Sequence, residues 1–156
     1  MLNKEQNLLD NILVKITTFY MLPIIMLFAF YVQLHGDISP GGGFQAGVIF
    51  ACSYILAVFI FGTKEANKFI PIHFIRFILP IGVLIYIGTG FVCLFLGGKF
   101  LEYNVLAHSQ AHGQHWGLFS IELGVGITVF SAMSLIVYMF AKYLEGQKTN
   151  DNTHSN

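Results

Sequence analysis

Residues 31–51 read YVQLHGDISPGGGFQAGVIFA, and this stretch joins two long apolar segments. Its centre, SPGGGF at residues 39–44, is a poor start for a helix, because glycine carries the highest backbone entropy cost and proline supplies no N–H. A hairpin between two membrane helices needs only a few polar residues. Three consecutive glycines also allow another surface to approach closely and allow a positive φ. We therefore predict a junction shaped for a contact or for an ion path.

The apolar segments on both sides of this junction indicate the class of protein. The chain has 156 residues, of which 55% are hydrophobic and 10% charged, and its mean hydropathy is +0.68. Soluble domains carry about 25% charged residues. Four runs, at residues 16–34, 44–61, 74–96 and 117–138, are long enough to cross about 30 Å of hydrocarbon, and none alternates like a barrel strand. The sequence predicts an all-α polytopic membrane protein with four transmembrane helices in one small bundle.

Basic residues predict the orientation of the chain. Seven of them flank the predicted spans on one side, and only Lys99 falls on the other. Those on the first side are Lys4, Lys15, Lys64, Lys68, Arg76, Lys142 and Lys148. Because basic residues remain cytoplasmic, both termini are predicted to be inside. Residues 1–143 form the predicted transmembrane domain, and residues 144–156 form a short polar C-terminal tail that we expect to be disordered. The formal net charge of zero gives no indication of nucleic acid as a partner.

Small residues recur at four-residue spacing in the second and fourth predicted spans. Such stripes let helix backbones approach closely in lipid, either within this chain or against partner subunits. The stripes are Gly43, Gly47 and Ala51, and Ser120, Gly124, Thr128 and Ala132. At about 100° per residue, Glu122 and Gly126 lie on roughly the opposite side of the fourth helix from its stripe. A helix with features on two sides predicts neighbours on both.

Glu122 is the only acidic residue inside a predicted span. A carboxylate in the membrane costs a few kcal/mol on insertion scales unless it is paired or hydrated, so such a residue is a functional candidate by default. It is either a cation or proton site, a partner for a cation on another subunit, or a carboxylate that reaches back to water. His35 and Asp37 flank the Pro-Gly turn and either gather cations at the outer mouth or are ordinary polar loop residues.

The outer loop contains three histidines, His108, His112 and His115, in HSQAHGQHW at residues 108–116. If the segment were helical, their spacing would put three imidazoles on one face, and three histidines can bind zinc or copper. Gly113 weakens a helix there, and no carboxylate or cysteine completes the set. We assign no metal ligands and favour a hydrated loop that responds to pH.

Motifs of soluble enzymes do not occur in this sequence. The Gly41–Gly43 run lacks the lysine of a phosphate-binding loop, and there is no Cys-x-x-Cys pair and no nucleophile with a placed histidine. We therefore predict no catalytic residue and no cofactor. Cys52 and Cys93 are expected to be buried free thiols. Pro23 and Pro80 are expected in the first turns of their helices, where a missing N–H costs little.

Two motifs in this chain resemble those of a known family. The run GDISPGGGFQAG at residues 36–47 resembles the signature of the MnhB-type domain, which forms one small subunit of the multisubunit Mrp sodium/proton antiporter. The segment IELGVG at residues 121–126 resembles the acid-apolar-Gly-Val stretch in the last helix of that family. Chain length and four spans agree, while the long histidine-rich outer loop departs from the pattern.

The resemblance implies a function. Complexes of this family exchange cytoplasmic sodium for external protons, and their large subunits resemble the proton-pumping subunits of respiratory complex I. The MnhB-type chain is one of the small subunits held to be needed for sodium transport or assembly. We therefore expect a non-catalytic subunit in the inner (plasma) membrane of a prokaryote, contributing to assembly and to the cation pathway. Candidate residues for the ion pathway or for subunit contacts are Glu122, Asp37, Pro40, Gly41, Gly42, Gly43 and Phe44.

Two alternatives stay open at the level of sequence. Similar subunits occur in the membrane arms of hydrogenases and related redox-driven ion pumps, and nothing in this sequence separates those from an antiporter. A protein of another class, a stand-alone membrane metal-binding protein or sensor, would use the His108, His112 and His115 loop.

Overall fold

The prediction of an all-α chain is confirmed. The computed structural model describes the backbone of residues 2–36, 41–103 and 110–154, and the side chains of residues 12–36, 41–103 and 113–147. Within those ranges the chain forms helices and no strand. The helices are α1 (Leu2–Leu34), α2 (Gly43–Phe61), α3 (Thr63–Phe69), α4 (Ile72–Phe95) and α5 (Gln110–His154).

Four segments of these helices are long and apolar enough to cross a membrane, as predicted. They are Ile12–Leu34, Gly43–Phe61, Ile72–Phe95 and Gly113–Gln147. Helix α5 has 45 residues, and at 1.5 Å per residue its length is about 68 Å, roughly twice the thickness of the hydrocarbon. The expectation of a disordered tail is wrong, because α5 continues to His154. Once a helix is nucleated, each further residue adds a hydrogen bond, so the polar end can continue the apolar span.

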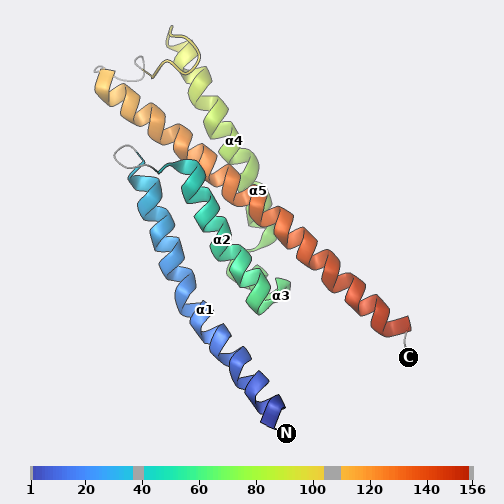
Figure 1. Ribbon diagram of the computed structural model, residues 1–156. Coiled ribbons are helices and arrows are strands. Elements are labelled where there is room, and N and C mark those ends of the chain that lie inside the picture. The colour runs from blue at the N-terminus through green and yellow to red at the C-terminus, as the bar shows by residue number, and fades with distance from the viewer. Residues whose placement is uncertain (1, 37–40, 104–109, 155–156) are drawn as a thin grey trace.

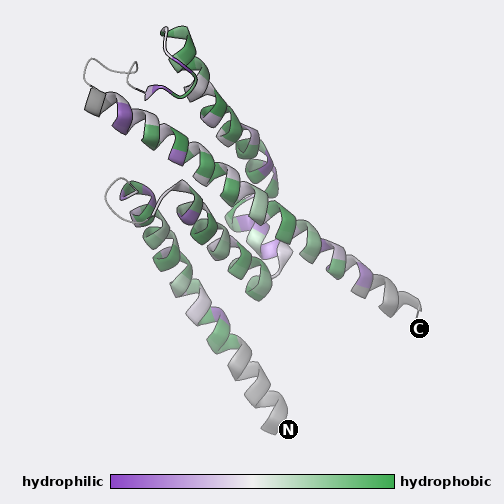
Figure 2. Cartoon of the chain, turned by 45° about the horizontal axis from the view of Figure 1, so that its top comes forward, coloured by the Kyte–Doolittle hydropathy of each residue, from purple (hydrophilic) through white to green (hydrophobic). Residues whose placement is uncertain are grey.

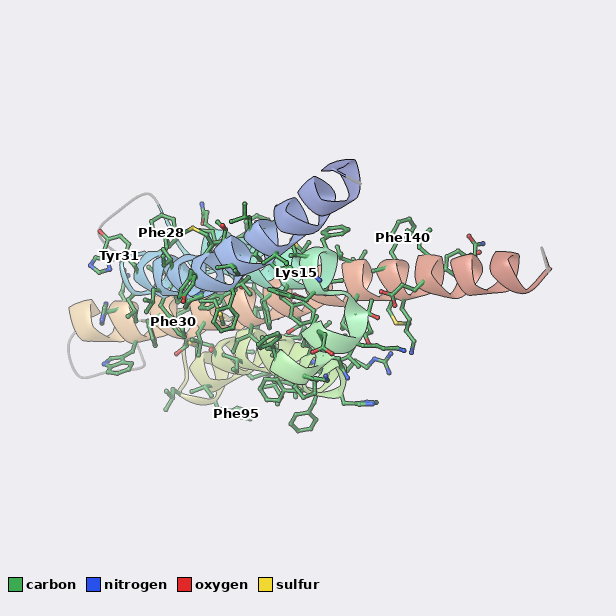
Figure 3. All side chains as sticks on the ribbon, turned by 90° about the horizontal axis from the view of Figure 1, so that it is seen from below. Lys15, Phe28, Phe30, Tyr31, Phe95 and Phe140 are labelled. Atoms are coloured by element: carbon green, nitrogen blue, oxygen red, sulfur yellow. The ribbon has the colours of Figure 1, made fainter. Side chains whose placement is uncertain are left out.

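The four long helices form an open row where a compact bundle was expected. Helix α2 packs on α1 and α5, and α5 packs on α2 and α4. Helix α4 therefore lies on the far side of α5 from α1 (Figures 1 and 3). Both ends of the chain lie at the same end of the molecule, as an even number of crossings requires (Figure 1). Whether that end is cytoplasmic stays a prediction.

The row leaves apolar side chains exposed along its length. Hydrophobic residues predominate along the spanning helices (Figure 2), and many of their side chains are exposed. Phe28 on α1, Phe95 on α4 and Phe140 on α5 stand out from the row (Figure 3), with 55%, 87% and 63% of their surfaces exposed. Burial from water cannot drive helix association in lipid, so the contacts within the row depend on close backbone packing.

The contact between α4 and α5 is made by small residues. A Cβ built on Gly82 of α4 would lie 2.9 Å from the carbonyl oxygen of Gly124 and 2.9 Å from the backbone nitrogen of Thr128. A Cβ on Gly124 would lie 2.9 Å from the Gly82 carbonyl oxygen. The small-residue stripe of α5 therefore packs on α4, while the opposite side of α5 packs on α2. The expectation of neighbours on both sides is confirmed, within this chain.

The connection between α2 and α4 is fixed by side-chain hydrogen bonds that sequence analysis did not predict. The Glu145 carboxylate on α5 accepts hydrogen bonds from the Thr63 hydroxyl (2.6 Å) and the Thr63 backbone N–H (3.3 Å) at the start of α3. The Asn67 side-chain oxygen accepts one from the Ile72 N–H (2.7 Å) at the start of α4. Gly62, between α2 and α3, has a φ of 87°, a left-handed value that favours glycine.

Three smaller expectations are wrong. Cys93 is buried as predicted, but Cys52 is exposed on α2, because its side of that helix has no neighbour in the row. Pro23 and Pro80 lie inside α1 and α4, since both helices begin well before them. Each proline leaves the carbonyl four residues earlier without its helical donor, a cost that membrane helices tolerate when the local backbone or neighbouring groups adjust.

Candidate functional site

The glycine junction lies directly against Glu122. A Cβ built on Gly36, just after α1, would lie 3.0 Å from both Cδ and Oε1 of Glu122. A Cβ on Gly42, just before α2, would lie 3.2 Å from Oε1. The carboxylate thus occupies space that is available because both positions lack a side chain. The two features that sequence analysis singled out separately form one site.

Helix α2 then continues along the same side of α5, backbone against backbone. A Cβ on Gly43 would overlap the Glu122 carbonyl oxygen and lie 2.8 Å from the Glu122 Cα. One turn later, a Cβ on Gly47 would lie 2.6 Å from the Gly126 carbonyl oxygen. The small-residue stripe of α2 therefore packs within this chain, on the side of α5 that carries Glu122 and Gly126.

Close approach, and not an unusual backbone angle, explains the glycines of this junction. Gly42 has a φ of 165° and a ψ of −176°, an extended conformation open to any residue. Among the described residues, the glycines with left-handed φ are Gly62 and Gly97, which lie elsewhere. The expectation of positive φ is therefore wrong for the described part of the junction, and the expectation of close contact is confirmed.

Gln33 is part of this site and was missed by sequence analysis. Its side chain, on the last turn of α1, is only 7% exposed. Its Oε1 lies 2.8 Å from the point where a Cβ on Gly126 would be, and the Gly43 carbonyl oxygen lies 3.1 Å from that same point. Its Nε2 is buried and has no hydrogen-bond partner among the described residues. The sequence did contain a signal, because Gln33 is an uncharged amide in an otherwise apolar run.

This arrangement contributes oxygen atoms from three neighbouring helices. The Glu122 carboxylate, the Gln33 amide oxygen and the Gly43 carbonyl oxygen lie within adjoining turns of α5, α1 and α2. Hard cations prefer oxygen ligands of these three kinds, and carboxylates in membrane segments also serve as proton relays. Gln33 and Gly126 also line an apolar groove of about 450 Å³ between α1, α2 and α5. These oxygen atoms are the kinds of ligand that a small cation or a proton would require.

The remaining predicted site residues are Asp37, Pro40, Gly41 and Phe44. Asp37 and Pro40 lie outside the described residues, and Gly41 is partly exposed. Phe44 is 60% exposed at the start of α2, so most of its ring is available to a neighbour.

The three histidines of the outer loop are only partly described. His108 and the side chain of His112 lie outside the described residues, whereas His115 is exposed and contacts Trp116 edge-on, with ring centroids 6.3 Å apart. The described side chains contain no group of three metal-ligating residues. The histidine loop therefore stays a prediction.

Comparison with known proteins identifies the family. A family model described as "Domain related to MnhB subunit of Na+/H+ antiporter" matches residues 13–135. The chain belongs to this MnhB family. A relative from Staphylococcus epidermidis, named "Putative antiporter subunit mnhB2", is 34% identical over 137 residues, which cover 86% of this chain and 94% of the relative. A Staphylococcus aureus protein of the same name is 33% identical over 137 residues, covering 86% of this chain and 92% of its own length.

The match to the MnhB family covers the site. Residues 13–135 include the whole junction, Gln33, Glu122 and the contacts of α5 with α2 and α4. With four helices able to span a membrane and bacterial relatives, the chain is an antiporter-subunit protein of a prokaryotic membrane. The resemblance found in the two sequence motifs is confirmed.

Proposed function

We propose that this chain is a non-catalytic small subunit of a multisubunit Na+/H+ antiporter, located in the inner (plasma) membrane with both termini cytoplasmic. It contributes to assembly of the complex and to the cation pathway. Membership of the MnhB family supports the antiporter. The side of the membrane follows from the basic residues, which remain cytoplasmic.

The contact between the glycine junction and Glu122 is the observation that carries this proposal. A carboxylate within a candidate span is costly unless it is paired, hydrated or used, and here three glycines lie against Glu122 while the buried Gln33 amide lies against Gly126, one turn along α5. In our proposal Glu122 binds the transported cation or a proton, with Gln33 as a neighbouring oxygen ligand. Gly42 and Gly43 keep the carboxylate at a fixed distance from α2.

Assembly follows from the open row. The spanning helices expose aromatic and aliphatic side chains on both sides of the row, and a complex with several subunits would cover part of that surface. We propose that the neighbours include the large subunits that resemble those of complex I. Phe44, which is 60% exposed at the start of α2, would belong to that contact, and we propose the same for Asp37 and Pro40 of the junction.

The first test replaces Glu122 by Gln in cells that lack the native gene. The substitution keeps the shape of the side chain and removes its charge. We expect the subunits to co-purify as before, while Na+-dependent proton movement in membrane vesicles is lost. Glu102→Gln, in the loop after α4, is the control and should leave transport unchanged. Full transport and normal assembly in Glu122→Gln would refute a role for the carboxylate, and co-purifying iron–sulfur subunits would favour a redox-driven complex.

The second test places bulk in the junction. Gly42→Val adds a branched side chain where even a Cβ would lie 3.2 Å from Glu122 Oε1. We expect it to damage transport more than membrane insertion. Gly88→Val is the control, because no heavy atom lies within 4 Å of a Cβ built there. If transport survives in Gly42→Val, the junction is only a connector.

A further inference from the structure

Two exposed cations lie near the point where the start of α4 meets α5. Arg76 of α4 is exposed, and its Nη2 donates to the sulfur of Met139 on α5 at 3.6 Å. Lys142, also exposed, follows Met139 by three residues, so both lie on neighbouring positions of the α5 surface. A thioether is a weak acceptor, and the other N–H donors of the Arg76 guanidinium remain able to bind a stronger acceptor. Figure 3 shows nitrogen-bearing side chains gathered in this region.

The nearby carboxylates are engaged elsewhere. Glu65 of α3 forms an ion pair with Lys68 at 2.6 Å, and Glu145 of α5 accepts the two hydrogen bonds from Thr63. The first turn of α4 contains no acidic residue. No carboxylate of the described residues forms an ion pair with Arg76 or Lys142. Glu145 keeps its negative charge three residues from Lys142, so Arg76, Lys142 and Glu145 together carry a net positive charge, and Arg76 forms no ion pair within the described chain.

An apolar wall continues from these cations toward the middle of the spans. Pro80 lies one turn further along α4 than Arg76, and Ile136 lies one turn deeper along α5 than Met139. Both are exposed, and Ile136 leaves 69% of its surface uncovered. Arg76 lies within a candidate span, about one turn from its start at Ile72. A basic side chain at this depth extends its charged end toward the interface. The surface thus presents cations at the membrane boundary and an apolar face below them.

We propose that this crossing binds an anionic phospholipid. The phosphate accepts hydrogen bonds from Arg76 and is attracted by Lys142, while an acyl chain lies along Pro80 and Ile136. A guanidinium suits phosphate because its planar fork donates two parallel hydrogen bonds. Basic pockets between membrane helices bind lipid headgroups in this way. A phospholipid matches both parts of this surface, because its phosphate complements the cations and its acyl chain covers Pro80 and Ile136.

The test measures lipid retention by the purified full-length chain. The protein is reconstituted in phosphatidylcholine nanodiscs containing a minor fraction of phosphatidylglycerol, and the bound lipid is counted by native mass spectrometry after release. Each cation near an anionic surface contributes about a fivefold preference, so we expect Arg76→Gln/Lys142→Gln to reduce selective retention by about 30-fold. Arg76→Lys keeps the positive charge but lacks the planar guanidinium, so its retention of phosphatidylglycerol should lie between that of the wild type and that of the double variant. Lys99→Gln, at the other end of the row, is the matched control and should retain phosphatidylglycerol like the wild type.

Three results would overturn the proposal. The first is equal retention of phosphatidylglycerol by the wild type and the double variant. The second is displacement of the lipid by millimolar inorganic phosphate, which would indicate a site for a free anion. The third is a cross-link, in the purified complex, between position 142 and an acidic residue of another subunit without bound lipid. Both substitutions lie on the surface, and equal helical circular dichroism of the variants would exclude misfolding as the cause of a loss.

Discussion

Replacing Gly43 by Ala tests whether the contact between α2 and α5 depends on the missing side chain. The new Cβ would overlap the Glu122 carbonyl oxygen and lie 2.8 Å from the Glu122 Cα. These are backbone atoms, so no side-chain rotation relieves the overlap, and the two helices must separate by clearly more than about 1 Å to restore ordinary contact distances. A gap of about 0.5–1 Å already forfeits a quarter to a half of the dispersion energy of the atoms that lose contact, so the loss here is at least that large.

The expected change in the free energy of unfolding follows from two opposing effects. Overpacking of this kind typically costs about 1–3 kcal/mol, whereas alanine stabilises a helix interior by up to about 1 kcal/mol relative to glycine. The second term is small at Gly43, which is the first residue of α2. Gly88→Ala isolates the propensity term, because a Cβ there would meet no heavy atom within 4 Å and Gly88 lies inside α4. We expect the two variants to differ by about 2–4 kcal/mol, with Gly43→Ala the less stable.

The assay is reversible unfolding of the purified chain in mixed detergent micelles, followed by circular dichroism as the fraction of dodecyl sulfate rises. The unfolding midpoints of Gly43→Ala, Gly88→Ala and the wild type are compared at one protein concentration. If Gly43→Ala unfolds at the same midpoint as Gly88→Ala, the backbone contact between α2 and Glu122 does not stabilise the fold, and our explanation of the junction fails.

Three further substitutions test separate contacts. Gly82→Ala should destabilise the α4–α5 pair by about 1–3 kcal/mol, because its Cβ would lie 2.9 Å from the Thr128 backbone nitrogen; a wild-type unfolding midpoint would contradict this. Glu145→Ala should lower the free energy of unfolding by about 1.5–3 kcal/mol and speed amide exchange in α3, since the Thr63 hydroxyl and N–H both lose their acceptor; unchanged exchange would show that these hydrogen bonds are dispensable. Tyr54→Phe should be neutral or stabilising in the same unfolding assay, because the buried Tyr54 hydroxyl has no partner among the described residues; a loss above about 1 kcal/mol would reveal one.

The fold was largely predictable because hydropathy alone identifies spans. Each predicted span lies within or close to an observed helix, and the small-residue spacing on α5 correctly predicted two neighbours. The ends of the helices were not predictable in the same way. Apolar composition marks where a helix meets lipid, whereas α1 and α5 continue through polar sequence, where backbone hydrogen bonds persist without hydrophobic cost.

The site was half predictable. Unusual residues in an apolar context, Glu122 and the glycine run, were visible as separate features, but their contact was not, because it depends on the pairing of α2 with α5. Gln33 was missed because it carries no charge, although a buried amide in lipid is also costly. The Thr63–Glu145 bonds join residues 82 positions apart, and no local pattern predicts such a pairing.

The two contacts of α2 with α5 explain why Glu122 can be held so firmly. Gly43 meets the backbone of Glu122 at one end of α2, and Thr63, just beyond the other end, is bound by Glu145. Glu122 and Glu145 are 23 residues apart on one helix, about 35 Å, which is slightly more than the thickness of the hydrocarbon. Helices α2 and α5 are therefore tied together at both ends of α2. Because Glu122 lies at one of these ties, the Gly43 contact restrains its backbone relative to α2. Helix α4 packs on the other side of α5 through Gly82 and Gly124, backbone against backbone, so α5 is held between α2 and α4.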